Sequence, residues 1–206
     1  MLGLEIIGTG HYVPGKPVTN EDLSRVMDTS DEWVVQRTGI RQRHYAPDGV
    51  GASDLAAEAA KRALEAARIP AKDVDYIIFA TMTPDYVFPG SAPLLGAKLG
   101  LEGVPCLDIR QQCAATLFGL QMANGLVKTG AARTILFVGA EAHAGFMPWS
   151  SWDALDPESG KVASDEERAR NNAHRALAVL FGDGAGALVL RATDRPGAGI
   201  LGMKIF

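Results

Sequence analysis

The chain has only two cysteines and four histidines among its 206 residues. Cys106 and Cys113 lie too close in sequence to close a long disulfide loop, and they form no paired Cys-x-x-Cys motif. We therefore predict two free thiols and exclude a disulfide-stabilised scaffold. The histidines show no metal-ligand spacing, so we expect no metal site; they are His11, His44, His143 and His174.

Long hydrophobic runs and an excess of charge are also missing. No apolar run approaches the ~20 residues of a membrane span, and the N-terminal stretch MLGLEIIGTG has neither the basic flank nor the cleavage site of a signal peptide. The formal net charge is −4 and 21% of the residues are charged, so we expect no general attraction to nucleic acid or to anionic lipid. These absences predict a cytoplasmic protein.

The hydrophobic fraction of 47% is sufficient for one large domain or two small ones. Apolar runs such as LEIIG, DYIIFATM and TILFVGA alternate with helical patterns, which favours an α/β fold with a buried, mostly parallel sheet covered by helices. We expect a helix over residues 53–67, with Ser53 as its N-cap and Asp54 in its first turn. Its predicted buried face contains Leu55, Ala59, Ala63 and Ala67.

Four further segments have recognisable patterns. The stretch after Cys113 is apolar on nearly every side, which predicts a helix buried all round. Residues 148–175 are rich in Trp, Ser, Asp, Glu, Arg and Asn, which predicts a surface insertion with a short helix near residues 164–171. The stretch ALAVLFGDGAGALVLRA predicts a β-hairpin around a glycine-rich turn, and GILGMKIF predicts the start of another strand.

Cys113 stands in DIRQQCAATLFGL, where a short apolar run gives way to a longer one, as at a strand-to-helix junction. In the first turn of a helix, unsatisfied N–H groups and the positive end of the helix dipole stabilise a thiolate. The same amides could hold the oxyanion of an attacked thioester. Cys113 is therefore a candidate nucleophile. A small hydrophobic core residue is the alternative, and this interpretation suits Cys106 in VPCLDI better.

Two other motifs suggest ligand chemistry. FGDGAGA leads into the strand pattern ALVLRA and not into a helix, so we exclude a phosphate loop for a dinucleotide. TSDEWVVQRTGIRQRH places Trp33 near Arg37, Arg41 and Arg43, and a Trp that stacks on a flat ring beside an Arg that binds phosphate suits a nucleotide-bearing ligand. The alternative is an amphipathic helix with its Trp toward the core and its arginines toward solvent.

The chain resembles the β-ketoacyl-ACP synthase III family of the thiolase superfamily in five ordered stretches: IIGTGHYVPGKPVTNEDL, DTSDEWVVQRTGIRQRH, DYIIFATMTPD, DIRQQCAATLFGLQMANGLVKTG and FGDGAGALVL. The resemblance implies a layered α-β-α-β-α architecture built from two similar halves. Residues 1–192 would form the first half, with a surface insertion at about 148–175. Residues 193–206 would then start the second half.

The resemblance also implies roles for individual residues. Cys113 would accept an acyl group from acyl-CoA, with the oxyanion held partly by its own backbone N–H. Trp33 and Arg37, with Thr29 nearby, would contact the adenine end of coenzyme A, and Arg175 would hold its other side. Phe88 in DYVFPGS would reach across a homodimer interface to line the partner's acyl pocket. No cofactor is implied, because coenzyme A arrives as part of the substrate.

In the second stage of such a reaction, a malonyl group on acyl carrier protein loses carbon dioxide and attacks the acyl-enzyme, with the help of a His and an Asn from the second half. No motif here matches those two residues, so we expect the C-terminal half on another chain or missing from this fragment. The turn RQQCAAT and the insertion favour polyketide or other secondary metabolism over primary fatty-acid initiation. The lack of Glu in ATMTP argues against hydroxymethylglutaryl-CoA chemistry. Two alternatives are an acyltransferase that forms no carbon–carbon bond and a non-catalytic partner subunit.

Overall fold

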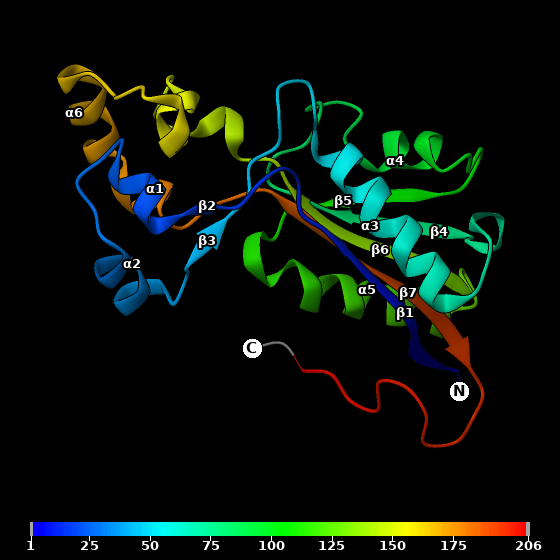
Figure 1. Cartoon of the computed structure of the whole chain (residues 1–206). Coiled ribbons are helices and arrows are strands. Elements are labelled where there is room, and N and C mark those ends of the chain that lie inside the picture. Colours follow the sequence, from blue (N-terminus) through cyan, green and yellow to red (C-terminus); the bar gives the residue numbers. More distant parts are fainter. Residues whose placement is uncertain (1, 205–206) are drawn as a thin grey trace. The chain divides into compact units, whose positions relative to one another are not determined.

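A computed structural model describes residues 2–204 of the chain. The chain divides into two compact units, each made of segments that are distant in sequence (Figure 1). Unit 1 contains residues 2–13, 49–142 and 184–204, and unit 2 contains residues 14–48 and 143–183. Among the described residues, no helix is long and apolar enough to cross a membrane.

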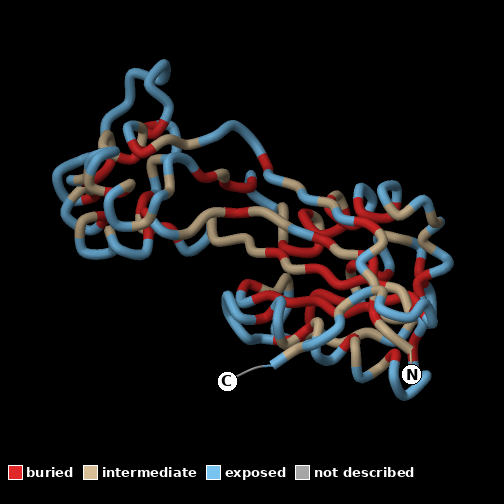
Figure 2. The backbone as a smooth tube through the Cα atoms, turned by 90° about the horizontal axis from the view of Figure 1, so that it is seen from below, coloured by how far each residue is buried: buried red, intermediate tan, exposed pale blue. Residues whose placement is uncertain are grey.

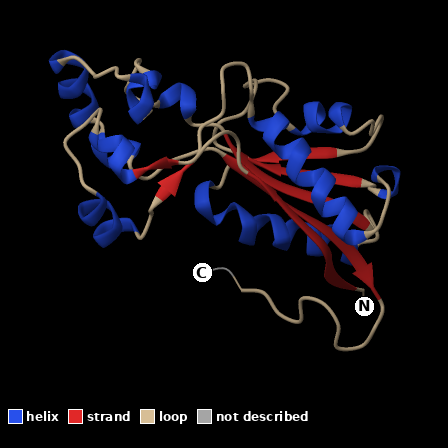
Figure 3. Ribbon diagram, in the orientation of Figure 1, coloured by secondary structure: helices blue, strands red, loops and turns tan. Residues whose placement is uncertain are grey.

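The centre of unit 1 is a five-stranded sheet in the order β1-β7-β6-β4-β5 (Figure 3). β4, β5 and β6 are parallel to one another, whereas β7 lies between β1 and β6 and runs antiparallel to both. Four of the five strands thus run in the same direction, which confirms the prediction of a mostly parallel sheet, and only β7 runs in the opposite direction, between two earlier strands. The strand bounds are β1 Gly3–Tyr12, β4 Tyr76–Ala80, β5 Cys106–Ile109, β6 Thr134–Glu141 and β7 Gly184–Thr193.

Helices cover both faces of this sheet, and the buried residues of unit 1 gather along its strands (Figure 2). α3 (Ala52–Ala67) and α4 (Ala92–Lys98) lie on one face, and α5 (Ala115–Lys128) lies on the other (Figure 1). A one-turn 3-10 helix, η1 (Ala71–Asp73), precedes β4. Unit 1 therefore has an α-β-α arrangement.

The helix predicted over residues 53–67 is confirmed as α3, and its predicted inner face is buried or, at Ala67, partly buried. Its cap differs from the prediction. Gly51 is the N-cap, and its N–H donates to the Asp54 carboxylate at 3.0 Å. Ser53 instead donates its hydroxyl to Asp85 Oδ1 at 2.8 Å. The Ser53 hydroxyl, which the local pattern predicted as the helix cap, is therefore bonded to Asp85, a residue 32 positions away.

α5 approaches the sheet closely at Gly119. A Cβ at this position would lie 2.6 Å from Cζ of Phe137 on β6. Ala115, Ala123 and Val127 are buried on the same side of the helix, but Leu117 is 55% exposed. The prediction of burial all round is therefore wrong for the described residues, in which only one sheet covers this helix.

Unit 2 is a small, mainly helical body. Its elements are β2 (Val18–Thr19) paired antiparallel with β3 (Gln42–Arg43), α1 (Asn20–Ser24), α2 (Asp31–Thr38), η3 (Ala144–Phe146), η4 (Trp152–Leu155), η5 (Pro157–Ser159), α6 (Asp165–Ala173) and α7 (Arg175–Ala178).

The core of unit 2 combines both of its segments. It contains Leu23, Val26, Met27, Val34, Tyr45, Met147, Trp149, Ala154, Leu155, Ala178 and Val179. The segment predicted as a surface insertion therefore supplies three residues of this core, Trp149, Ala154 and Leu155. The short helix predicted near residues 164–171 is confirmed as α6, with Ser164 as its N-cap. On α6, buried Glu167 accepts hydrogen bonds from the backbone N–H groups of Ser150 and Ser151 at 2.7 and 2.9 Å.

Two predictions near the C-terminal end are wrong. The stretch ALAVLFGDGAGALVLRA does not form a hairpin, because its first apolar run lies in and just after α7 and only its second run forms β7. β7 has its partners in β1 and β6 instead. Ile200–Lys204 form no strand, although Ile200 N–H donates to Leu4 O at 2.8 Å. The last two residues of that predicted strand, 205–206, lie outside the described residues.

Candidate active site

Cys113 lies in a tight turn that joins β5 to α5. The 3-10 helix η2 (Gln112–Ala114) contains it, and the N-cap of α5 is Ala114. The sequence placed Cys113 in the first turn of the helix, but it lies just before that turn, in the 3-10 helix. Its side chain is exposed and forms no disulfide, as predicted. A thiol in this position is open to attack a thioester.

The backbone of this turn is strained at the residue before the cysteine. Gln112 has φ +46°, in the left-handed region that costs a residue with a side chain about 1 kcal/mol or more. Hydrogen bonds from Ala114 N to Gln111 O and from Ala115 N to Gln112 O maintain the turn. The Cys113 N–H donates to neither of these two carbonyls. Strain of this kind is found at functional sites, where surrounding structure maintains it.

The turn lies at the edge of the sheet where the parallel strands β5, β4 and β6 all end, which is where open α/β sheets bind ligands. Thr81 follows β4, and its N–H donates to Ile109 O at the end of β5 at 3.2 Å. Cys113 is four residues farther along the chain. The exit of β4 is thus fixed to the strand that leads into the cysteine turn.

Glu141, the last residue of β6, lies at the same edge and was not predicted as a site residue. Its carboxylate accepts a hydrogen bond from the Thr83 hydroxyl at 2.6 Å and from Met82 N at 2.8 Å. It also accepts one from the Thr81 hydroxyl at 3.3 Å. A Glu therefore lies against the stretch ATMTP, although that stretch contains none. These hydrogen bonds give the carboxylate a structural role. The sequence signal that could have identified Glu141 was an acidic residue at the end of a parallel strand.

Phe88 lies in the loop between β4 and α4 and is 90% exposed. The base of this loop is anchored: Asp85 N donates to Ser91 Oγ at 3.1 Å, and Ser91 N donates to Asp108 Oδ1 at 2.8 Å. Its neighbours Tyr86 and Val87 are also exposed. The loop therefore presents apolar side chains on an anchored base.

In unit 2, three residues singled out from the sequence lie together. The guanidinium carbons of Arg37 and Arg175 are 4.2 and 4.3 Å from the centroid of the Trp33 ring. Trp33 and Arg37 come from α2, and Arg175 begins α7. Trp33 is half-buried against the core while Arg37 is exposed, so the helix is amphipathic and carries the cluster as well. We call these three residues the Trp33 cluster.

Thr29 lies just before α2, and its hydroxyl oxygen is buried without a hydrogen-bond partner. A buried hydroxyl without a partner costs free energy, which a ligand could recover. The preceding residue, Asp28, accepts a hydrogen bond at its carbonyl from Arg175 Nη1 at 2.7 Å. Hydrogen bonds from Arg168 and Asn172 lower the pKa of the Asp28 carboxyl.

Cys106 differs from Cys113. It is half-buried at the start of β5 and packs against the core on the α3 side of the sheet. Burial raises the pKa of its thiol, with a smaller contribution from Asp108. Both features favour the structural role that the sequence suggested.

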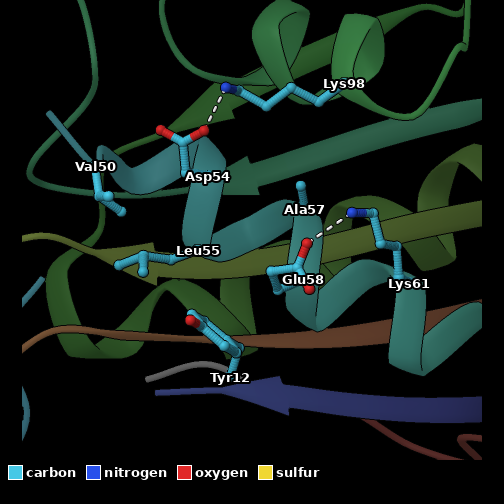
Figure 4. Close-up of a pocket in the computed structure, with 8 residues that line it drawn as sticks. All are labelled: Tyr12, Val50, Asp54, Leu55, Ala57, Glu58, Lys61 and Lys98. Atoms are coloured by element: carbon cyan, nitrogen blue, oxygen red, sulfur yellow. Dashed lines mark hydrogen bonds and ion pairs between the residues drawn. The ribbon is translucent and has the colours of Figure 1, made fainter. Parts of the chain in front are cut away.

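Two cavities in the structure contain none of the residues predicted for the site. One, of about 410 Å³, lies beside α3 and is lined by Tyr12, Val50, Asp54, Leu55, Ala57, Glu58, Lys61 and Lys98 (Figure 4). Its charged groups neutralise one another in the Asp54–Lys98 and Glu58–Lys61 ion pairs. The other, of about 320 Å³, lies in unit 2 beside Tyr45 and Trp152. Within residues 2–204, no three His, Cys, Asp or Glu side chains are grouped to hold a metal ion.

Comparison with known proteins gives the family. The family model described as thiolase, N-terminal domain, matches residues 34–153. The chain belongs to the thiolase N-terminal domain family. Residues 162–206 match the model of 3-oxoacyl-[acyl-carrier-protein] synthase III. The predicted resemblance to β-ketoacyl-ACP synthase III is thereby confirmed for the N-terminal portion of that fold.

Individual relatives agree with this assignment. Over 194 residues the chain is 42% identical to β-ketoacyl-[acyl-carrier-protein] synthase III of Neisseria meningitidis serogroup C. The matched region covers 94% of this chain and 53% of the relative. The crystal structure of 3-oxoacyl-[acyl-carrier-protein] synthase III from Aquifex aeolicus is 36% identical with a TM-score of 0.76, covering 94% of this chain and 55% of that one.

A structure of a priming β-ketosynthase from a polyketide biosynthetic pathway also matches. It is 28% identical with a TM-score of 0.76 and covers 95% of this chain and 52% of that one. The thiolase-like α/β fold predicted from the sequence is confirmed by these structures. The chain spans about half the length of the curated relatives it matches.

Proposed function

We propose that this chain carries the nucleophile and the coenzyme A site of a condensing enzyme of the β-ketoacyl-ACP synthase III type, in fatty-acid or polyketide synthesis. The observation that carries the proposal is the exposed Cys113 in a strained turn at the ligand-binding edge of the sheet. The similarity to synthase III enzymes supports it.

In the proposed first stage, the Cys113 thiolate attacks the carbonyl carbon of an acyl-CoA thioester. A C–S bond forms to Cys113, and the carbonyl electrons move onto oxygen, where the Cys113 N–H helps to stabilise the charge. Collapse of this intermediate breaks the original C–S bond and releases the thiolate of coenzyme A, which takes a proton from solvent. The product is an acyl-enzyme.

The Trp33 cluster is the proposed site for the nucleotide end of coenzyme A. An adenine ring can enter between the Trp33 indole and the Arg175 guanidinium, which contact each other at 4.3 Å in this structure and must separate to admit it, and Arg37 can pair with phosphate. The buried Thr29 hydroxyl without a partner supports a polar ligand at this place. The cationic side chains here suit the negative charge of the ligand.

The second stage needs more than this chain supplies. We propose that the acceptor is a malonyl group on acyl carrier protein, and that the condensing His and Asn come from the C-terminal half of the fold. We also propose a homodimer in which Phe88 lines the partner's acyl pocket. The exposure of Phe88 on an anchored loop supports this role.

The test of this proposal is intact-mass analysis of the protein after mixing with a panel of acyl-CoAs. We expect an adduct with the mass of one acyl group, lost in Cys113→Ala and retained in Cys106→Ala. Absence of any adduct in the native protein, or an adduct that persists in Cys113→Ala, would overturn the proposal. Release of carbon dioxide from malonyl-ACP then distinguishes condensation from simple acyl transfer.

A further inference from the structure

We propose that Asn20 and Arg43 are positioning residues for the nucleotide site, acting through the helices that carry the Trp33 cluster. This inference rests on the proposed function. Asn20 is fully buried and Arg43 is 6% exposed, and both belong to unit 2. Arg43 Nη2 donates to Asn20 Oδ1 at 2.7 Å, which joins the two side chains directly.

The Asn20 amide holds both ends of α2. Its Nδ2 donates to Asp31 Oδ1 at 2.8 Å and to Ile40 O at 2.7 Å. Asp31 is the first residue of α2, and Ile40 lies two residues beyond the last. Trp33 and Arg37 lie between these two anchor points, so the amide fixes the helix that presents them.

The Arg43 guanidinium extends the connection to α7. Its Nη2 also donates to Val179 O at 3.1 Å. Val179 is the C-cap of α7, and its own N–H donates to Arg175 O at 3.0 Å. The backbone of Arg175 is therefore two hydrogen bonds from the Arg43 guanidinium. One buried pair of side chains thus reaches both helices of the cluster.

The charges in this network favour one orientation of the Asn20 amide. The Asn20 oxygen faces the positive guanidinium of Arg43 and its nitrogen faces the negative carboxylate of Asp31, so each bond polarises the other in the favourable sense. The Arg43 guanidinium donates to three neutral oxygens, those of Val18, Asn20 and Val179, and burial lowers its pKa. A buried charge without an ion-pair partner is a poor means of gaining stability.

Geometry is what such a network can supply. A base that stacks on Trp33 and on Arg175 touches side chains from two different helices, so its affinity depends on the spacing between them. Fixing the backbones of the two helices before the ligand arrives leaves only the Arg175 side chain to move off the Trp33 ring, which lowers the cost of ordering the site. The consequence of loosening it is weaker binding of the nucleotide end and unchanged chemistry at Cys113.

The test uses Asn20→Asp, which keeps the acceptor for Arg43, loses both donor bonds to α2 and brings a carboxylate toward Asp31. A second variant, Arg43→Lys, keeps the positive charge but loses the two terminal guanidinium nitrogens that donate the hydrogen bonds. We expect the Kd for coenzyme A, measured by titration calorimetry, to rise about tenfold in each, which corresponds to about 1.4 kcal/mol. The rate of Cys113 acylation by an acyl N-acetylcysteamine thioester, which lacks the nucleotide, is expected to stay within about twofold of the wild type, a difference of about 0.4 kcal/mol.

Glu167→Gln is the matched control. It disturbs another buried polar network of unit 2 that holds Ser150 and Ser151 and contacts neither α2 nor α7, so the Kd for coenzyme A is expected to stay unchanged. Circular dichroism and urea unfolding identify any variant that fails to fold. If one of Asn20→Asp and Arg43→Lys does not fold, the Kd of the other tests the inference.

Four outcomes would contradict the inference. A wild-type Kd in both folded variants, or a loss in the rate of acylation by the N-acetylcysteamine thioester as large as the loss in affinity for coenzyme A, would overturn the positioning role while leaving the proposed function intact. A Kd that rises as much in Glu167→Gln as in Asn20→Asp would also overturn it, because the effect would then follow general stability. Absence of coenzyme A binding in the wild-type protein would overturn the proposed function as well.

Discussion

Replacement of Gly119 by Ala tests how closely α5, the helix that follows the Cys113 turn, must approach the sheet. The added Cβ would lie 2.6, 2.7 and 3.1 Å from three ring atoms of Phe137, which is 3% exposed and has little room to move. Gly125→Ala, in the same helix, is the matched control because a Cβ there meets nothing within 4 Å.

The expected sizes follow from two opposing effects. Each variant gains about 1 kcal/mol from the better helix propensity of Ala. Overpacking a buried site costs about 1–3 kcal/mol, and only Gly119→Ala incurs this cost. We therefore expect Gly125→Ala to stabilise the protein by about 1 kcal/mol and Gly119→Ala to lie about 1–3 kcal/mol below it.

Urea unfolding followed by circular dichroism measures both differences. A third variant, Phe137→Leu, removes the ring atoms that the new Cβ would meet. In that background the gap between Gly119→Ala and its parent should shrink, which a double-mutant cycle reports as a coupling energy. The reasoning is refuted if Gly119→Ala is as stable as Gly125→Ala, or if Phe137→Leu leaves the gap unchanged.

Three further predictions concern stability and binding. Glu167→Gln should lower the free energy of unfolding by about 1–3 kcal/mol at pH 7. Burial alone raises the pKa of this carboxyl, but its hydrogen bonds from Ser150 and Ser151 lower it below 4.5. The difference from wild type in urea unfolding should therefore persist above that pH and shrink as the pH falls through the lowered pKa. Gly10→Ala should destabilise unit 1 strongly because its Cβ would meet backbone of α3 at 2.2 Å, whereas Gly186→Ala, with open space, should be tolerated in the same assay. Trp33→Ala should raise the Kd for coenzyme A in titration calorimetry about tenfold, about 1.4 kcal/mol, and Trp152→Ala, a partly exposed Trp outside the cluster, should leave this Kd unchanged.

The parts of the fold that could be predicted are those that local pattern determines. The spacing of Leu55, Ala59 and Ala63 predicted the inner face of α3 because a helix that covers a sheet must bury one stripe. The direction and partners of β7 could not be predicted, because they depend on β1 and β6, which are distant in sequence. The N-cap of α3 was missed for the same reason, since Asp85 competes for the Ser53 hydroxyl.

The candidate site divides along the same line. Cys113 stood out because a strand-to-helix junction is visible in the sequence, although its exact position ahead of the helix depends on the 3-10 turn. The role of Trp33 came from family resemblance, and the structure adds the two guanidinium groups over its ring. Glu141 was missed because its partners Met82 and Thr83 are 59 and 58 residues away. The roles of all the site residues stay predictions; they are Cys113, Thr29, Trp33, Arg37, Arg175 and Phe88.

The interleaved make-up of unit 2 has a consequence for how the protein is synthesised. A ribosome releases Pro14–Asp48 first and must then translate all of Gly49–Ala142 before the rest of unit 2 exists. The hydrogen bond from Arg175 to Asp28 joins residues 147 positions apart, and contacts of this kind form late because closing such long loops is entropically costly. The apolar side chains of Pro14–Asp48 therefore stay uncovered during synthesis until His143–Asp183 has emerged, after most of unit 1.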